Sequence, residues 1–112
     1  MKPATKWVEV AVAQGPPAGK AILATLADNA IALFNVDGVL FALDDFCIRC
    51  GSSLAAGKLQ AFLITCSGCD WQYDATTGCV SRIPALRIDT FETKIADSRI
   101  MVATTAKPYT GP

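Results

Sequence analysis

The sequence predicts an all-β fold, a small β-sandwich or barrel. Apolar residues occur in many short runs, and Gly, Asp or Pro turn signals separate these runs at close spacing. No segment reads convincingly as a helix, since the one helix-tolerant stretch, residues 53–59, is interrupted by Gly57. With 112 residues, of which 52% are hydrophobic, the chain suits a single domain built around one core.

The first half of the chain predicts four strands joined by turns. We expect the strands at residues 7–13, 20–27, 30–34 and 39–43. The Pro16-Pro17 pair marks the first turn, because proline cannot donate to a sheet ladder. Asp28-Asn29 can supply the second turn, and Asp37-Gly38 is the strongest hairpin signal in the chain. The runs at 30–34 and 39–43 are continuously apolar, which is typical of buried strands.

The second half predicts shorter strands. They are expected at residues 62–65, at 71–73, around 86–88, from 91 onward and at 99–103. Leu86 and Ile88 share one face, but the apolar phase then slips to Phe91 and Ile95. A slip of one residue flips the buried face, so we expect a bulge or strand break near Asp89-Thr90. Thr77-Gly78 and Asp97-Ser98 are expected turns, and residues 104–112 a flexible tail.

The charge and hydropathy of the chain exclude several functional classes. The formal net charge is zero, which gives no electrostatic reason to expect nucleic acid or anionic lipid as a partner. No apolar run reaches the roughly 18 uninterrupted residues of a membrane span. The N-terminus lacks the apolar stretch of a secretory signal. We therefore expect a cytoplasmic protein without a membrane partner.

Two Cys-x-x-Cys pairs, Cys47/Cys50 and Cys66/Cys69, are the most informative feature, because the chain contains no histidine. Four thiolates paired in this way surround one tetrahedral metal ion or one small iron–sulfur cluster. Soft sulfur ligands select zinc or iron over magnesium or calcium. The fifth cysteine, Cys79, follows a turn at an expected strand start and is interpreted as a small, partly buried residue.

The residues around the pairs carry a resemblance. The series includes Asp44-Asp45-Phe46-Cys47, Gly51-Ser52-Ser53-Leu54 and Trp71-Gln72-Tyr73-Asp74. From about Trp7 to Val102 the chain resembles the Rieske-type ferredoxins and Rieske [2Fe–2S] domains. The resemblance implies one Rieske-like domain over residues 1–112. Within it, a small metal-binding subdomain of two cysteine-bearing loops would span about residues 44–83.

The departures from the family pattern concern its ligands. The family's loops read Cys-x-His and Cys-x-x-His, and Cys47 and Cys66 match the two cysteines. Arg49 stands at the first histidine position and cannot ligate a metal, but Cys50 follows it; Cys69 stands at the second. Each lost imidazole is thus accompanied by a nearby thiol. The result has the Cys-x-x-Cys pairs of rubredoxins and zinc ribbons. We therefore expect Cys47, Cys50, Cys66 and Cys69 to bind the metal or cofactor.

Two kinds of centre remain open at this point. Family descent favours a [2Fe–2S] cluster with four cysteine ligands. The shorter reach of cysteine favours a single iron or zinc ion held as in rubredoxin. If the centre is a cluster, its potential should be low, since all-cysteine plant-type ferredoxins lie near about −400 mV and histidine-ligated Rieske centres at about −150 mV or above.

The resemblance implies an electron-transfer component and not an enzyme. The chain has no nucleophile with a base, no P-loop and no dinucleotide fingerprint. We expect a small Rieske-like ferredoxin that passes single electrons between a reductase and a terminal oxygenase or similar enzyme. The alternatives are a redox-inert zinc module that binds a partner protein, and an accessory subunit similar to the small Rieske-like subunit of nitrite reductases.

Overall fold

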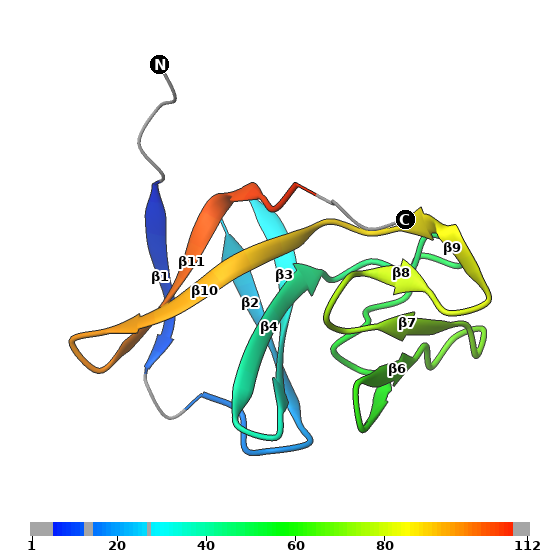
Figure 1. Cartoon of the computed structure of the whole chain (residues 1–112), viewed down its shortest axis with the longest axis horizontal. Coiled ribbons are helices and arrows are strands. Elements are labelled where there is room, and N and C mark those ends of the chain that lie inside the picture. Colours follow the sequence, from blue (N-terminus) through cyan, green and yellow to red (C-terminus); the bar gives the residue numbers. More distant parts are fainter. Residues whose placement is uncertain (1–5, 13–14, 27, 109–112) are drawn as a thin grey trace.

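The structure is a computed structural model that describes residues 6–12, 15–26 and 28–108. Every regular element in these residues is a β-strand (Figure 1), so the all-β prediction is confirmed. The strands are β1 (Trp7–Val12), β2 (Ala21–Leu26), β3 (Asn29–Val36), β4 (Val39–Asp44), β5 (Lys58–Gln60), β6 (Leu63–Thr65), β7 (Gln72–Asp74), β8 (Cys79–Val80), β9 (Ile83–Arg87), β10 (Thr90–Ala96) and β11 (Arg99–Ala106). None of the described residues belongs to a helix able to cross a membrane.

The strands form two antiparallel sheets. The larger has six strands in the order β1-β11-β10-β4-β3-β2, and the smaller has five in the order β5-β6-β7-β8-β9. Figure 1 shows the larger sheet curling on the left and the smaller sheet on the right. The chain leaves the larger sheet after β4, builds the whole smaller sheet, and returns as β10 beside β4, with Leu43 opposite Thr90. The smaller sheet is therefore an insertion between two neighbouring strands.

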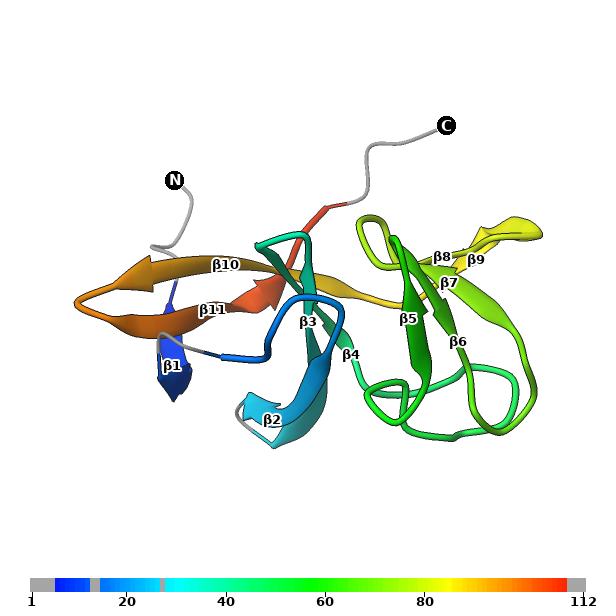
Figure 2. The same cartoon turned by 90° about the horizontal axis from the view of Figure 1, so that it is seen from below.

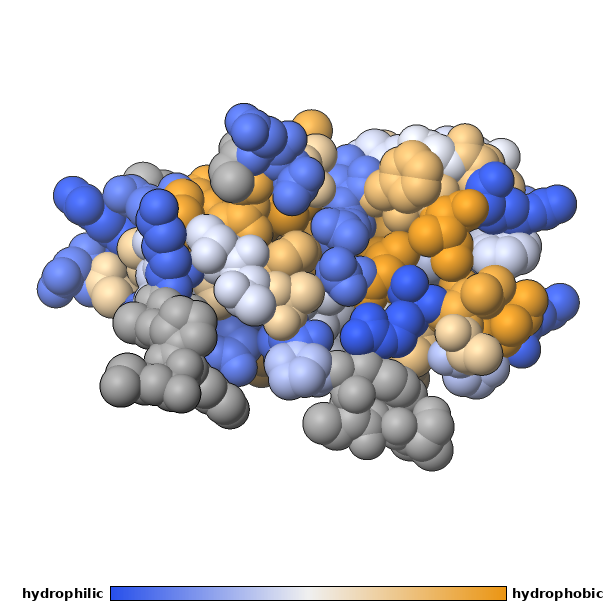
Figure 3. Space-filling view, turned by 90° about the horizontal axis from the view of Figure 1, so that it is seen from above, coloured by the Kyte–Doolittle hydropathy of each residue, from blue (hydrophilic) through white to orange (hydrophobic). Residues whose placement is uncertain are grey.

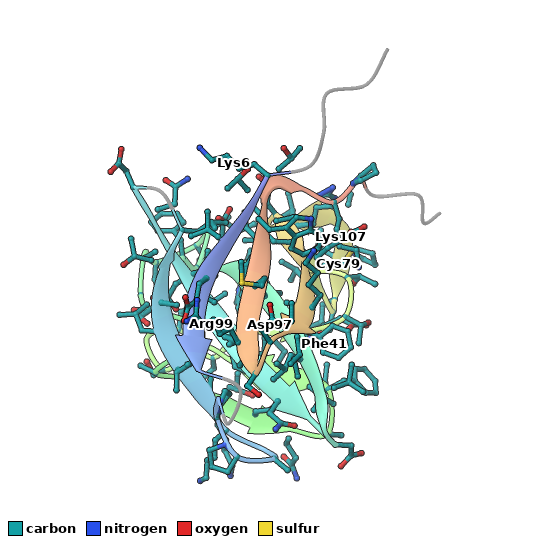
Figure 4. All side chains as sticks on the ribbon, turned by 90° about the vertical axis from the view of Figure 1, so that its left-hand side faces the viewer. Lys6, Phe41, Cys79, Asp97, Arg99 and Lys107 are labelled. Atoms are coloured by element: carbon teal, nitrogen blue, oxygen red, sulfur yellow. The ribbon has the colours of Figure 1, made fainter. Side chains whose placement is uncertain are left out.

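Two tight hairpin turns lie where the sequence predicts them. Val36 pairs with Val39 across Asp37 and Gly38, whose φ angles are 52° and 91°. Ala96 pairs with Arg99 across Asp97 and Ser98, and the labelled Asp97 and Arg99 lie at this turn in Figure 4. Two consecutive positive φ angles give a turn whose twist matches that of the strands.

The hairpin between β2 and β3 turns one residue earlier than expected. Leu26 pairs with Asn29, so Asn29 belongs to the ladder and not to the turn. Ala27, which precedes Asp28 in that turn, lies outside the described residues. The side chain of Asn29 is exposed, which lets a polar residue occupy the first position of this strand.

The predicted strand break near Asp89-Thr90 is confirmed, and it is the point where the chain changes sheets. Strand β9 ends at Arg87 in the smaller sheet, and β10 begins at Thr90 in the larger one. Ile88 between them is buried, but Leu86 is 40% exposed. The expected shared face was therefore wrong, because β9 is an edge strand whose side chains face outward. Strand β11 continues to Ala106 and takes in part of the expected tail, of which residues 109–112 lie outside the described residues.

Strand β3 separates two hydrophobic cores. Ile31 and Leu33 pack in a core within the larger sheet, and Ala32 and Phe34 pack in a second core shared with the smaller sheet. Successive side chains of a strand point to opposite faces, so a strand with a core on each side needs an unbroken apolar run. Residues 31–34 have this arrangement, whereas Ala30 and Val39, the first residues of the two predicted runs, are exposed.

Gly78 fits the turn after β7 closely against the segment that leads back to the larger sheet. Its φ is +80°, and its carbonyl oxygen accepts the Ile88 N–H at 3.0 Å. A Cβ at this position would overlap the carbonyl oxygen of Ile88 and lie 3.0 Å from Thr90 Cγ2. Glycine is therefore required here both by backbone conformation and by space.

We expect Gly78→Ala to destabilise the fold by about 1–3 kcal/mol more than Gly19→Ala. Gly19 has nearly the same φ, +82°, but nothing lies within 4 Å of its Cβ direction. The difference between the two variants therefore isolates the steric overlap from the backbone strain. Urea unfolding of both variants at equal metal content measures it, and equal stabilities would contradict the packing described here.

Candidate metal centre

The first cysteine loop, residues 47–52, follows β4 and closes on itself through its backbone. The Cys47 N–H donates to the Ser52 carbonyl oxygen at 3.0 Å, and the Gly51 N–H donates to the Cys47 carbonyl oxygen at 2.8 Å. Gly51 has a φ of +81°, a conformation that glycine adopts without steric cost. This closure turns both Cys47 and Cys50 toward the same side of the loop.

The second cysteine loop, residues 66–71, joins β6 to β7 and repeats the same bonds. The Cys66 N–H donates to the Trp71 carbonyl oxygen at 2.8 Å, and the Asp70 N–H donates to the Cys66 carbonyl oxygen at 3.0 Å. Asp70 has a φ of 65°, which is positive like that of Gly51. Both loops lie at the lower right of Figure 2. The chain therefore presents two loops of one conformation.

The four sulfur atoms of these loops converge. All four Sγ atoms lie within 4.8 Å of one another, with 3.7 Å between Cys47 and Cys69 and 3.5 Å between Cys50 and Cys66. Cys47 and Cys66 are fully buried, Cys69 is half-buried and Cys50 is exposed. Four thiolates so placed could hold a transition-metal ion between them. Within the described residues Cys79, which is buried in β8, is not part of the group.

Tyr73 holds the innermost sulfur. Its hydroxyl group donates to Cys47 Sγ at 3.2 Å and accepts the Ile48 N–H at 3.1 Å. Burial raises the pKa of Cys47, but the Tyr73 hydroxyl and the N–H groups of Cys50 and Arg49 outweigh it and lower that pKa to about 6. Burial, together with the nearby Cys47, raises the pKa of Tyr73, which keeps the hydroxyl protonated as a donor. The site thus favours a thiolate at Cys47.

The second loop directs equivalent N–H groups at its own first sulfur. Gly68 N lies 3.4 Å from Cys66 Sγ, and the Cys69 N–H also favours the Cys66 thiolate. Burial nevertheless raises the pKa of Cys66, and neighbouring sulfurs contribute to that rise. The Trp71 N–H favours the Cys69 thiolate, but burial and the other three thiols raise the pKa of Cys69 to about 12. Four thiolates at this spacing therefore require a cation between them.

Several residues near the loops have roles that the sequence did not assign. Ser52 Oγ lies 3.3 Å from Cys50 Sγ, and no sequence signal distinguishes this serine from its neighbour. The Arg49 guanidinium lies over the Trp71 ring, 5.5 Å from its centroid, and is exposed. Its positive charge therefore lies beside the second loop.

Other residues singled out in the sequence are structural. Asp45 accepts the Ala55 N–H at 2.7 Å and so fixes the start of the segment leading to β5. Burial, followed by the charge of Asp89, raises the pKa of Asp44. Pro84 lies exposed within β9, where proline is tolerated because β9 is an edge strand.

Comparisons with known proteins agree on the family. The sequence model of the Rieske [2Fe–2S] domain matches residues 6–92. The ferredoxin component of the naphthalene 1,2-dioxygenase system of Pseudomonas aeruginosa is 26% identical over 98 residues, covering 87% of this chain and 94% of that protein. The ferredoxin component of the naphthalene 1,2-dioxygenase/salicylate 5-hydroxylase systems of a Ralstonia species is 27% identical over 97 residues, covering 86% and 93%.

Solved structures agree on the fold. The Sphingomonas yanoikuyae B1 ferredoxin has a TM-score of 0.79 at 22% identity, covering 88% of this chain and 98% of that one. A chain of a complex of reduced oxygenase and oxidized ferredoxin in carbazole 1,9a-dioxygenase has a TM-score of 0.81 at 22% identity, covering 91% and 96%. The Rieske-like fold predicted from the sequence is therefore confirmed.

The group that gives the family its name does not fit this site unchanged. A Rieske cluster takes two imidazole ligands on one of its irons. The chain has no histidine, and thiols stand where the two loops converge. A centre with that ligand set therefore cannot form here, and the groups that converge at the loops are thiols.

We expect Gly68→Ala to weaken metal binding at these thiols by about tenfold or more, as overpacking of about 1–3 kcal/mol implies. A Cβ at Gly68 would overlap Ser52 Oγ and lie 2.9 Å from Cys50 Sγ, so it would push the two loops apart. Titration of the metal-free protein with Co²⁺, followed by visible absorption, measures the affinity. Ser67→Ala, an exposed change in the same loop, is the control and should bind as the parent does.

Proposed function

The chain belongs to the Rieske [2Fe–2S] domain family, and from this premise we propose that it is a one-electron carrier of the ferredoxin kind. The observation that carries the proposal is the convergence of four cysteine sulfurs within 4.8 Å at the loops of the smaller sheet. Cys47, Cys50, Cys66 and Cys69 would be the ligands of an iron centre. Iron held by thiolates accepts and returns single electrons, which is the chemistry the centre would supply.

The relatives indicate the kind of partner. The two bacterial relatives named above are ferredoxin components of dioxygenase systems, and they span nearly the same length as this chain. By analogy, this chain would receive electrons from a reductase and deliver them to a terminal oxygenase or a similar enzyme. The zero net charge favours a brief, partly apolar contact with each partner. A cytoplasmic location accords with a centre built from free thiols.

The position of the sulfurs suits electron transfer at the surface of the two loops. Cys47 and Cys66 are fully buried, while Cys50 is exposed, so the centre would lie just beneath the surface. Phe46 and Ile48, on either side of Cys47, are 54% and 40% exposed. Hydrophobic and charged side chains also alternate over the right-hand half of Figure 3, which carries β8 and β9. These exposed apolar groups would form the contact with a partner.

Reduction and reoxidation of the purified protein test the proposal. Protein isolated without air should show a visible iron–thiolate band that dithionite bleaches, and each reduced chain should reduce one cytochrome c. The Cys50→Ser variant, which removes a single sulfur ligand, should lose the band or shift it strongly. A colourless protein that binds zinc from a medium rich in iron would overturn the carrier role and leave a structural zinc module.

Tyr73→Phe should lower the reduction potential by about 20–65 mV. The Tyr73 hydroxyl donates to Cys47 Sγ at 3.2 Å, and such a bond stabilises the reduced, more negative state more than the oxidised one. Its loss, worth about 0.5–1.5 kcal/mol, converts to this shift at about 59 mV per factor of ten for one electron.

Gln72→Ala is the matched control for this measurement. Gln72 neighbours Tyr73 in β7 and bonds Thr65 Oγ1 at 3.3 Å, so its loss removes a hydrogen bond that touches no sulfur. Protein-film voltammetry should show its potential unchanged. A Tyr73→Phe potential equal to that of the parent would mean that this hydroxyl does not tune the centre.

A further inference from the structure

We propose that the chain holds one metal ion in a tetrahedron formed by Cys47, Cys50, Cys66 and Cys69, in place of the two-iron cluster for which its family is named. The inference deepens the proposed function, because it rests on the same four thiols acting as ligands. It concerns the nuclearity of the centre, because the family is named for a [2Fe–2S] cluster whose usual histidine ligands this chain lacks.

The spacing of the sulfurs is that of a single tetrahedral site. A metal–sulfur bond of about 2.3 Å in a regular tetrahedron separates each pair of sulfurs by about 3.8 Å. Two pairs lie close to this value, at 3.7 Å for Cys47–Cys69 and 3.5 Å for Cys50–Cys66. No pair exceeds 4.8 Å. One ion at the centre of the group therefore reaches all four atoms after small side-chain adjustments.

A two-iron cluster needs a longer and less regular cage. Two FeS₄ tetrahedra that share an edge of bridging sulfides, with bonds of about 2.3 Å, place thiolates of opposite irons about 5.3 and 6.5 Å apart. Four of the six distances between thiolates belong to such opposite pairs. In this chain all six are within 4.8 Å. Each of these four sulfur–sulfur distances is therefore too short for the cluster.

The two loops also present their sulfurs in equivalent ways. The first cysteine of each loop has its N–H bonded to the carbonyl five residues on, and its carbonyl bonded to the N–H four residues on. Each loop ends its turn with a positive φ, at Gly51 and at Asp70. The two loops therefore supply their sulfurs in the paired arrangement that a single tetrahedral ion accepts.

Contacts around the loops oppose the widening that a cluster would require. Cys47 is fully buried and is held by the Tyr73 hydroxyl at 3.2 Å. Cys66 is also fully buried, so neither inner sulfur can retreat without opening the core. Between the loops, the approach at Gly68 leaves no room even for a Cβ beside Ser52. Two bridging sulfides would have to fit between loops that already approach this closely.

Metal analysis combined with X-ray absorption tests the inference on the full chain, expressed with ample iron and sulfide and purified without air. We expect one metal per chain, no acid-labile sulfide, a single shell of four sulfurs at about 2.3 Å and no metal–metal scattering. For iron, the oxidised protein should give an EPR signal, because a ferric ion has an odd number of electrons.

The possible outcomes separate this inference from the carrier role. Two irons with two sulfides, and an EPR signal that appears only on reduction, would overturn the single-ion site and leave the electron-carrier proposal standing. One zinc in the same four-sulfur shell would support the single-ion site and overturn the carrier. The matched control is Cys79→Ala, which should keep the metal count. A loss of metal in that variant would overturn the four-cysteine tetrahedron, because it would add a fifth sulfur to the site.

Discussion

Four thiolates cannot lie within a few ångströms of one another unless a cation neutralises them, and the architecture around the cysteine loops serves this requirement. The protein supplies backbone N–H groups and the hydroxyls of Tyr73 and Ser52 to the sulfurs, but it places no buried positive side chain among the described residues beside them. Hydrogen bonds from neutral donors orient the sulfurs and spread part of their charge. In the proposed metal-bound protein the ion would balance the remaining charge, so the loops and the ion would be parts of one structure.

Tyr73 connects this site to the rest of the molecule. Its ring is fully buried in the core that the two sheets share, together with Phe34 and Leu43 of the larger sheet. Its hydroxyl group ends at Cys47 Sγ and at the Ile48 N–H. A side chain that packs at one end and donates at the other fixes the first loop relative to β7, which leads out of the second. The geometry of the sulfurs therefore depends on the packing of the hydrophobic core.

The sequence predicted the features that local chemistry determines. Turn residues with a preference for positive φ placed the Asp37-Gly38 and Asp97-Ser98 hairpins, and the phase slip after Ile88 located the change of sheet. Contacts between distant segments could not be predicted in the same way. The alternation of Leu86 with Ile88 predicts a shared buried face. Leu86 is nevertheless exposed, because β9 lies at the edge of its sheet. The approach of Gly68 to Ser52 likewise depends on how the two loops face each other.

The insertion of the smaller sheet has a consequence for how the chain folds. Leu43 and Thr90 are neighbours in the larger sheet, yet the entire cysteine-bearing segment separates them along the chain. Joining them in an unstructured chain closes a long loop, and the entropy lost in that step slows folding. A metal ion bound as proposed would gather residues 47–69 and bring the two ends of the segment closer before β4 and β10 pair. Loading of the centre would then be coupled to completion of the larger sheet, and a chain deprived of metal would reach its native topology more slowly.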